Sequence, residues 1–231
     1  MSVTDALFAP LFAANPGRPL ITHYDDAAGT RVELSRATVR NWAAKTANWL
    51  RDEHDVEPGD EVAVLLPAHW QTAGVLLGAW WCGAVVTDDP AGAKVALVPP
   101  GGTAPGAAVT AVVSLHPMGL GTGAPVDYND DVRLHGDDFA PWEPVPGSTP
   151  ALLKSTVDEV VAEAHRRAET LGITASSRVL STVEWSLPDG LLGGFLAVLA
   201  GGGSLVQCSN AAPDLLPARR AAEQTTLDLV G

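Results

Sequence analysis

Residues 56–67, VEPGDEVAVLLP, and residues 78–86, GAWWCGAVV, decide the fold of this chain. The PGD triplet in the first stretch predicts a turn, and the continuous apolar run after it is typical of a strand buried in a parallel sheet. Pro67 ends that strand, residues 69–82 have the composition of an apolar helix, and residues 84–87 predict the next strand. Together the two stretches therefore predict a βαβ unit, in which a helix joins two parallel strands.

The alternation of strands and helices continues on both sides of this unit. Further strands are predicted at 20–24, 30–34, 94–98, 109–114, 179–183 and 204–208, with a short polar strand within 127–136. Further helices are predicted at 5–14, 35–54, 155–171, 187–200 and 218–225. The helix at 155–171 opens with a capping box that runs from Ser155 to Asp158.

This alternation predicts an α/β fold, with a mostly parallel sheet and helices on both of its faces. We expect one domain over residues 1–231. An internal subdivision, if there is one, falls near residues 140–154, a stretch that contains four prolines.

A net charge of −13, from 14 Lys and Arg against 27 Asp and Glu, argues against several functions. A surface this negative repels phosphate backbones, so we expect no nucleic acid among the partners. The most apolar stretches, 74–86 and 191–206, are shorter than the roughly 20 residues of a membrane span, and residues 1–14 lack the basic region of a secretory leader. We therefore expect no membrane partner and a cytoplasmic protein.

The two cysteines, Cys82 and Cys208, both lie in apolar runs. Such cysteines are typical of buried free thiols in a reducing compartment rather than of a disulfide or metal framework. We therefore expect neither a disulfide nor a metal site.

Three blocks of sequence carry a resemblance to a known family. They are residues 19–34 with the helix after them, residues 56–67 with 78–86, and residues 178–206. The second block matches the family phrase GDRVAVLLPN followed by LGALKAGAVVVP, and the third is similar to DRVLSTLPLFH followed by LLAGG. The chain thus resembles the N-terminal domain of the AMP-dependent acyl-CoA synthetase and ligase family, whose members form adenylates. The resemblance implies the fold of that domain.

The family's phosphate loop reads S/T-S/T-G-S/T-S/T-G-x-P-K, and its hydroxyls, backbone N–H groups and lysine hold phosphate oxygens. The equivalent stretch here is 145–154, VPGSTPALLK. Gly147, Ser148 and Thr149 agree with the pattern, a proline replaces the second glycine and removes a donor, and Lys154 comes one residue late. The resemblance implies an anion site at these four residues. The residues leave an alternative open, an ordinary Pro/Gly loop before a capped helix.

Other parts of the family's machinery have no counterpart in residues 1–231. These are the aromatic-Gly-x-Thr-Glu motif, the ribose-binding Asp, and the mobile C-terminal domain with its catalytic Lys. The resemblance therefore implies a truncated relative without adenylation activity, with no catalytic residue and no bound cofactor, that retains weak binding of a nucleotide or acyl ligand. The alternative is an interaction or regulatory protein that uses the scaffold for self-association or for docking a partner.

The apolar helix expected at 187–200 bears on that alternative. It is too apolar to face water on any side, so we expect its surface to be covered. Two-fold dimers are the commonest way to cover a self-complementary apolar patch. The sequence therefore predicts a homodimer that buries part of the C-terminal third.

The remaining candidates are aromatic residues and charge clusters. Core packing is predicted for the tryptophans at helical spacing, which are Trp42, Trp49, Trp70, Trp80 and Trp81. Trp142 and Trp185 lie outside the expected helices and are candidates for a pocket wall or an interface. His135 near Asp137 and Asp138 is the one combination that suits a metal or acid–base site, and solvated loop charge is its alternative.

Overall fold

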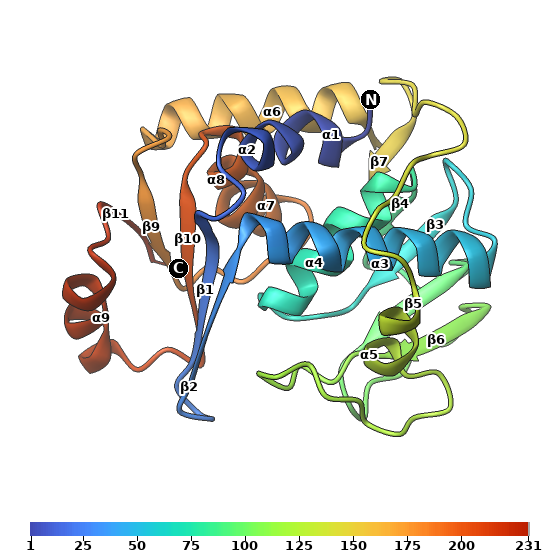
Figure 1. The fold of residues 1–231 in the computed structure, drawn as a ribbon, viewed down its shortest axis with the longest axis horizontal. Coiled ribbons are helices and arrows are strands. Elements are labelled where there is room, and N and C mark those ends of the chain that lie inside the picture. Colours follow the sequence, from blue (N-terminus) through green and yellow to red (C-terminus); the bar gives the residue numbers. More distant parts are fainter. Residues whose placement is uncertain (231) are drawn as a thin grey trace.

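The computed structural model describes residues 1–230, and within them the strands form two sheets (Figure 1). The first sheet has the order β11-β9-β10-β1-β2. Its strands are β1 (Pro19–Asp25), β2 (Thr30–Ser35), β9 (Arg178–Ser181), β10 (Ser204–Ser209) and β11 (Leu227–Leu229). Only β2 runs antiparallel to its neighbour within this described part of the chain, because it forms a hairpin with β1.

The second sheet has the order β6-β5-β3-β4-β7-β8. Its strands are β3 (Glu61–Val64), β4 (Val85–Thr87), β5 (Val95–Val98), β6 (Val109–Val112), β7 (Pro150–Leu152) and β8 (Ser155–Thr156). All neighbours are parallel except β7 and β8, which form a short antiparallel hairpin. The α/β class is therefore confirmed, but the strands are divided between two sheets where the sequence analysis expects one.

Two helices lie between the sheets. They are α3 (Arg36–His54), which contacts β1 and β2, and α4 (Trp70–Trp81), which contacts β1 of the first sheet and β3 and β4 of the second. Every residue of α4 is buried, as its all-round apolar composition requires. The two helices touch closely at Gly78, where a Cβ atom would come within 2.4 Å of the Thr46 Cβ. A larger residue at that position would separate them.

A second group of helices covers the edge of the molecule where the N-terminus lies (Figure 1). It consists of α1 (Val3–Leu7), α2 (Ala9–Ala14) and α6 (Val157–Leu171), with α1 packed against both α4 and α6. The capping box of α6 runs from Thr156 to Glu159, one residue later than expected. Gly172 ends the helix in the left-handed conformation.

The apolar segment expected as one helix at 187–200 is broken into three turns. It consists of α7 (Asp189–Leu191), a π-helical stretch (Leu192–Leu196) and α8 (Ala197–Ala200). Leu191, Phe195 and Leu196 are buried, and α8 contacts α6 and β10. The chain itself therefore covers this segment, so the segment gives no reason for a second copy to cover it.

Two smaller expectations concern residues 127–136 and the last helix. The polar strand expected within 127–136 is wrong, because this stretch forms α5 (Tyr128–Asp131) and a 3-10 turn (Val132–Leu134). Asp127 explains the difference, since its carboxylate accepts hydrogen bonds from the backbone N–H groups of Asn129 and Asp130 and so caps a helix. The last helix, α9 (Leu216–Glu223), lies on the outer face of the first sheet against Leu180, Val206 and Cys208.

The predicted core role of the helical tryptophans is confirmed. Trp49, Trp70, Trp80 and Trp81 are buried, and Trp42 is half-buried against the same core. No helix within residues 1–230 combines the length and the apolar character that crossing a membrane requires. Cys82 and Cys208 are buried and free, as predicted.

Candidate functional site

The four residues predicted to hold an anion lie in two different turns. Gly147, Ser148 and Thr149 precede β7, whereas Lys154 follows it in the turn that leads to β8. Ser148 and Lys154 are exposed, and the other two are half-buried. The strand β7 therefore separates the lysine from the three residues that match the phosphate-loop pattern.

The first amides of α6 are already used within the chain. The Val157 N–H donates to the Thr149 carbonyl at 2.9 Å, and the Asp158 N–H donates to the Gly147 carbonyl at 3.0 Å. The Asp158 carboxylate also lies against Gly147, since a Cβ atom there would come within 2.3 Å of Asp158 Oδ1. A helix N-terminus binds anions through free N–H groups, and here carbonyls and a carboxylate occupy that position. An anion at these residues stays a prediction.

The hairpin after this turn is very short. Its strands pair Pro150 with Thr156 and Leu152 with Ser155, so only Leu153 and Lys154 form the turn. Leu153 adopts a left-handed conformation with φ of 53°, and its N–H donates to the Val86 carbonyl. Lys154 therefore lies in a two-residue turn, apart from the loop that holds Gly147, Ser148 and Thr149.

A better candidate site lies between the carboxyl ends of strands from both sheets. It is a crevice of about 300 Å³, lined by Val64, Leu65, Leu66, Asp88, Glu184, Trp185, Ser186 and Leu187. These residues lie at or just after the ends of β3, β4 and β9. Ligands of open α/β sheets bind outside the carboxyl ends of parallel strands, so the crevice occupies the position where this architecture forms sites.

Trp185 forms one wall of the crevice, which is one of the two roles predicted for it. Its ring stacks on Phe195 of the π-helical stretch, with 4.6 Å between the ring centroids and 25° between their planes. Gly194 lets the indole approach, because a Cβ atom there would come within 3.3 Å of the Trp185 Cδ1. The wall is therefore apolar and fixed in place.

Two carboxylates give the crevice its charge. Asp88 and Glu184 are both exposed, and Glu184 Oε2 accepts a hydrogen bond from the Ala68 N–H at 3.5 Å. Asp88 was not predicted as a site residue. Its place at the end of β4, beside the end of β3, is the signal that could have assigned it to a site.

A buried polar cluster adjoins the crevice through Ala68. His23 on β1 and His69 before α4 lie with their ring centroids 4.3 Å apart, and Ser209 Oγ lies 2.9 Å from His23 Nε2. Ser209 Oγ also donates to the Ala68 carbonyl at 2.9 Å. The hydroxyl has one proton, so the hydrogen-bond pattern assigns the second bond to a proton on His23 Nε2.

Both imidazoles are neutral at physiological pH. Burial lowers the pKa of His23 to about 4, although Asp25 and the Ala68 carbonyl favour its charged form. Burial, with a smaller contribution from His23, lowers the pKa of His69 to about 3. Because His23 donates to Ser209 instead of accepting its proton, the pair is not arranged as a base and nucleophile. The cluster supports the structure beside the crevice.

The combination of His135 with Asp137 and Asp138 is not brought together. His135 Nε2 lies 2.8 Å from Glu53 Oε1, whereas Asp137 pairs with Lys45 and Asp138 with Arg40. Within residues 1–230, no group of three or more His, Cys, Asp or Glu residues is placed to hold a metal ion.

No family model matches this chain, but solved structures match its fold. An acyl-CoA synthetase from Brucella canis superposes with a TM-score of 0.82 at 16% identity, over 100% of this chain and 47% of its own. The N-terminal domain of FACL13 from Mycobacterium tuberculosis gives 0.77 at 14%, over 99% and 62%. Acetoacetyl-CoA synthetase from Streptomyces lividans gives 0.80 at 18%, over 100% and 42%.

This chain therefore has the fold of the N-terminal domain of acyl-CoA synthetases, as the resemblance implies, and it spans about half the length of those enzymes. A much closer relative is a protein of Mycobacterium tuberculosis described as a TIGR03089 family protein. It is 46% identical over 238 residues, which cover 97% of each chain. The chain accordingly belongs to the TIGR03089 family.

Proposed function

We propose that this protein binds a small acyl-type ligand in the crevice between its two sheets and does not form acyl adenylates. The start of α6 carries the second half of the proposal, because its first N–H groups are engaged within the stretch in which the resemblance places the phosphate loop. Adenylation requires a nucleotide triphosphate to be held by positioned donors and charges. The donors at this point are engaged with Gly147 and Thr149.

The lining of the crevice supports an acyl group over a nucleotide. Val64, Leu65, Leu66 and Trp185 offer apolar surface, whereas Asp88 and Glu184 would face the phosphates of ATP with two negative charges. The carboxylates and the phosphates carry charge of the same sign and would repel each other within one crevice. The overall charge of −13 adds to that repulsion. A neutral ligand with an apolar chain avoids this cost.

A thermal-shift series tests the proposed ligand. The probes are ATP, AMP, coenzyme A and hexanoyl-N-acetylcysteamine, a neutral acyl thioester. We expect only the neutral thioester to raise the melting temperature, and at a concentration of 100 Kd it should add about 2.7 kcal/mol of stability. A shift with ATP and none with the thioester would overturn the proposal.

A pair of variants locates the binding. Leu66→Trp adds bulk at the crevice lining and should abolish the shift with the thioester. Leu215→Trp makes the same change at an exposed position beside α9 and should leave the shift intact. Equal shifts in both variants would place the ligand elsewhere.

The absence of adenylation is tested separately. ATP–pyrophosphate exchange should stay at buffer background with any carboxylate added, because the N–H groups at the start of α6 already donate to the Gly147 and Thr149 carbonyls. Exchange above background that Lys154→Ala removes would contradict this and would restore the predicted anion site.

Self-association is the second proposal, and three exposed apolar side chains favour it. Met118, Leu120 and Leu134 are 72%, 52% and 83% exposed. Arg133 Nη2 donates to the Gly119 carbonyl, so the segments that carry these residues adjoin. A contiguous exposed apolar patch marks a contact surface, and a two-fold dimer is the commonest assembly. Light scattering at tens of micromolar protein should give twice 23.9 kDa, and replacing the three residues with Ser should return the monomer. A monomeric mass for the unaltered chain would refute this proposal.

A further inference from the structure

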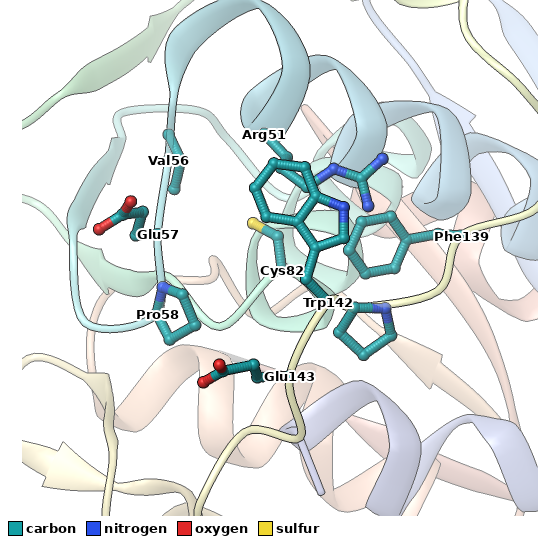
Figure 2. A pocket seen from close by; sticks show the side chains of 9 residues that line it. Arg51, Val56, Glu57, Pro58, Cys82, Phe139, Trp142 and Glu143 are labelled. Atoms are coloured by element: carbon teal, nitrogen blue, oxygen red, sulfur yellow. The ribbon is translucent and has the colours of Figure 1, made fainter.

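A second cavity, of about 440 Å³, lies away from the crevice and is built on different elements (Figure 2). One side is the segment that joins α3 to β3, with Val56, Glu57 and Pro58, and the other is the loop of residues 139–143. Val56, Cys82 and Phe139 are buried and supply apolar surface to the cavity. Burial raises the pKa of the Cys82 thiol to about 12, so this surface carries no thiolate charge.

Arg51 of α3 fixes the loop that closes the cavity. Its guanidinium lies between the rings of Phe139 and Trp142, at 4.8 and 5.0 Å from their centroids. Its Nη1 donates to the Ala140 carbonyl at 3.0 Å. Stacking of a guanidinium between two rings orders all three groups, so the aromatic side of the cavity is formed before any ligand arrives.

The charge of Arg51 is neutralised inside this arrangement. Its Nε and Nη2 donate to the two carboxylate oxygens of Asp52 at 2.6 and 3.2 Å, and Nη2 also donates to Asn48 Oδ1. These hydrogen bonds lower the pKa of Asp52. Most donors of the guanidinium are therefore engaged, and Arg51 is poorly placed to hold an anion.

Two other carboxylates also line the cavity. Glu57 and Glu143 are exposed, and within residues 1–230 neither makes an ion pair. Trp142 lies beside Glu143 with 79% of its surface exposed, an unusual position for the largest apolar side chain. The cavity thus combines apolar surface, an exposed indole and two unpaired negative charges.

We propose that this cavity binds an organic monocation with an aromatic or aliphatic body, such as a primary amine. The body would contact Val56, Cys82 and Phe139, and the ammonium group would lie near Glu57, Glu143 and the indole of Trp142. An indole and a carboxylate both attract a cation, and the net charge of the whole chain favours the same sign. A bare divalent cation fits less well, because it requires six or more oxygen ligands in place of apolar surface.

The test compares three probes of similar shape and different charge: phenethylammonium, 2-phenylethanol and 3-phenylpropionate. Binding is followed by the indole N–H signals of the seven tryptophans in a proton–nitrogen NMR spectrum, with the Trp142 signal assigned by its loss in Trp142→Phe. We expect phenethylammonium to shift the Trp142 signal with a Kd about tenfold below that of the alcohol, a difference of about 1.4 kcal/mol. The carboxylate should bind most weakly.

Single substitutions then test the two carboxylates. Glu57→Gln and Glu143→Gln should each weaken phenethylammonium severalfold and leave 2-phenylethanol unchanged. The control is Glu169→Gln, which removes the same charge from an exposed position on α6 and should change neither. Equal affinity for amine and alcohol, amine binding that survives both cavity substitutions, or no response at Trp142 to the amine would each overturn the proposal.

Discussion

The two faces of the first sheet hold polar groups in opposite ways, and β1 shows both. Successive side chains of a strand point to opposite faces. Thr22 and Tyr24 therefore lie on the outer face, under α9, while Ile21 and His23 lie on the inner face, toward α4. Ion pairs join the polar side chains of the outer face, whereas the inner face holds two neutral imidazoles.

Glu223 of α9 is the centre of the outer cluster. Its carboxylate accepts hydrogen bonds from Tyr24 Oη at 2.6 Å, from Arg31 Nε at 2.8 Å and from the Arg178 guanidinium. Burial alone would raise the pKa of Glu223, but these donors together lower it to about 2. The carboxylate is therefore charged, and it connects α9 to β1, β2 and β9.

Access to water and the available partners together explain the difference between the faces. The Arg31 side chain is 45% exposed, so part of the outer cluster remains in contact with solvent. The desolvation cost of its charges is therefore small. His23 and His69 have no such opening and no carboxylate in hydrogen-bond contact, so burial keeps both imidazoles neutral. The available partners, together with burial, decide which face carries charge, because cationic donors surround Glu223 and no carboxylate contacts the two imidazoles.

Acid should destabilise the inner and outer clusters in separate pH ranges, and this is the largest loss in the free energy of unfolding that we expect. Both histidines have folded pKa values below 6.5, so the unfolded chain binds more protons and stability falls as the pH drops from about 6.5 toward 4. Two such groups give a slope of up to about 2.7 kcal/mol per pH unit. Glu223 contributes stability above pH 4.5 and loses it as the pH falls toward about 2.

Urea unfolding at pH 7, 6, 5 and 4 measures this slope, and the histidine ring protons report which groups titrate. Two imidazole signals should stay in the neutral position down to about pH 5. A stability that is flat between pH 6.5 and 5 would contradict the neutral state of the inner face.

Removing the charge at the centre of the outer cluster should have the next largest effect. Glu223→Ala leaves Arg31 and Arg178 without their shared buried partner, and breaking such a pair costs about 3–5 kcal/mol. Urea unfolding at pH 7 measures the loss. Glu169→Ala, at an exposed position of α6, is the matched control and should stay within about 0.5 kcal/mol of the unaltered chain.

The same variants separate charge from packing. Glu223→Gln keeps the shape and one acceptor oxygen but removes the charge, so it should fall between the other two. A loss below about 1 kcal/mol for Glu223→Ala would mean that the cluster behaves like an ordinary surface pair.

The parts of the fold that depend on local sequence were predictable. The PGD turn and the apolar run after it identify β3, and the helix and strand that follow complete the βαβ unit. The division into two sheets was not predictable, because it depends on the pairing of β1 with β10, which lie far apart in the chain. A hydrophobic pattern identifies a strand without naming its partner.

The start of α6 shows the same limit on a smaller scale. Ser155 to Asp158 and Thr156 to Glu159 both have the spacing of a capping box. The hairpin selects the second, because Ser155 pairs with Leu152 and is held in β8.

The candidate sites were predictable only in part. Trp142 and Trp185 were predicted to line a pocket or an interface because they lie outside the expected helices, and each lines a cavity. The carboxylates beside them had no local signal. Asp88 becomes a crevice residue because β4 ends beside β3, and Glu143 lines the cavity because Arg51 holds its loop against α3.

The smallest effect should come from the hydroxyl that completes the inner face. Ser209→Ala removes the bond to the Ala68 carbonyl and the acceptor for His23 Nε2–H, and unpaired buried groups of this kind cost about 1–2 kcal/mol. Urea unfolding at pH 7 should show that loss, and the slope between pH 6.5 and 4 should remain, because burial and not Ser209 lowers the pKa of His23. Ser176→Ala, at an exposed hydroxyl, is the control. If the two variants lose equally little stability, the neutral cluster contributes nothing through its hydrogen bonds, and the inner face is held by apolar packing alone.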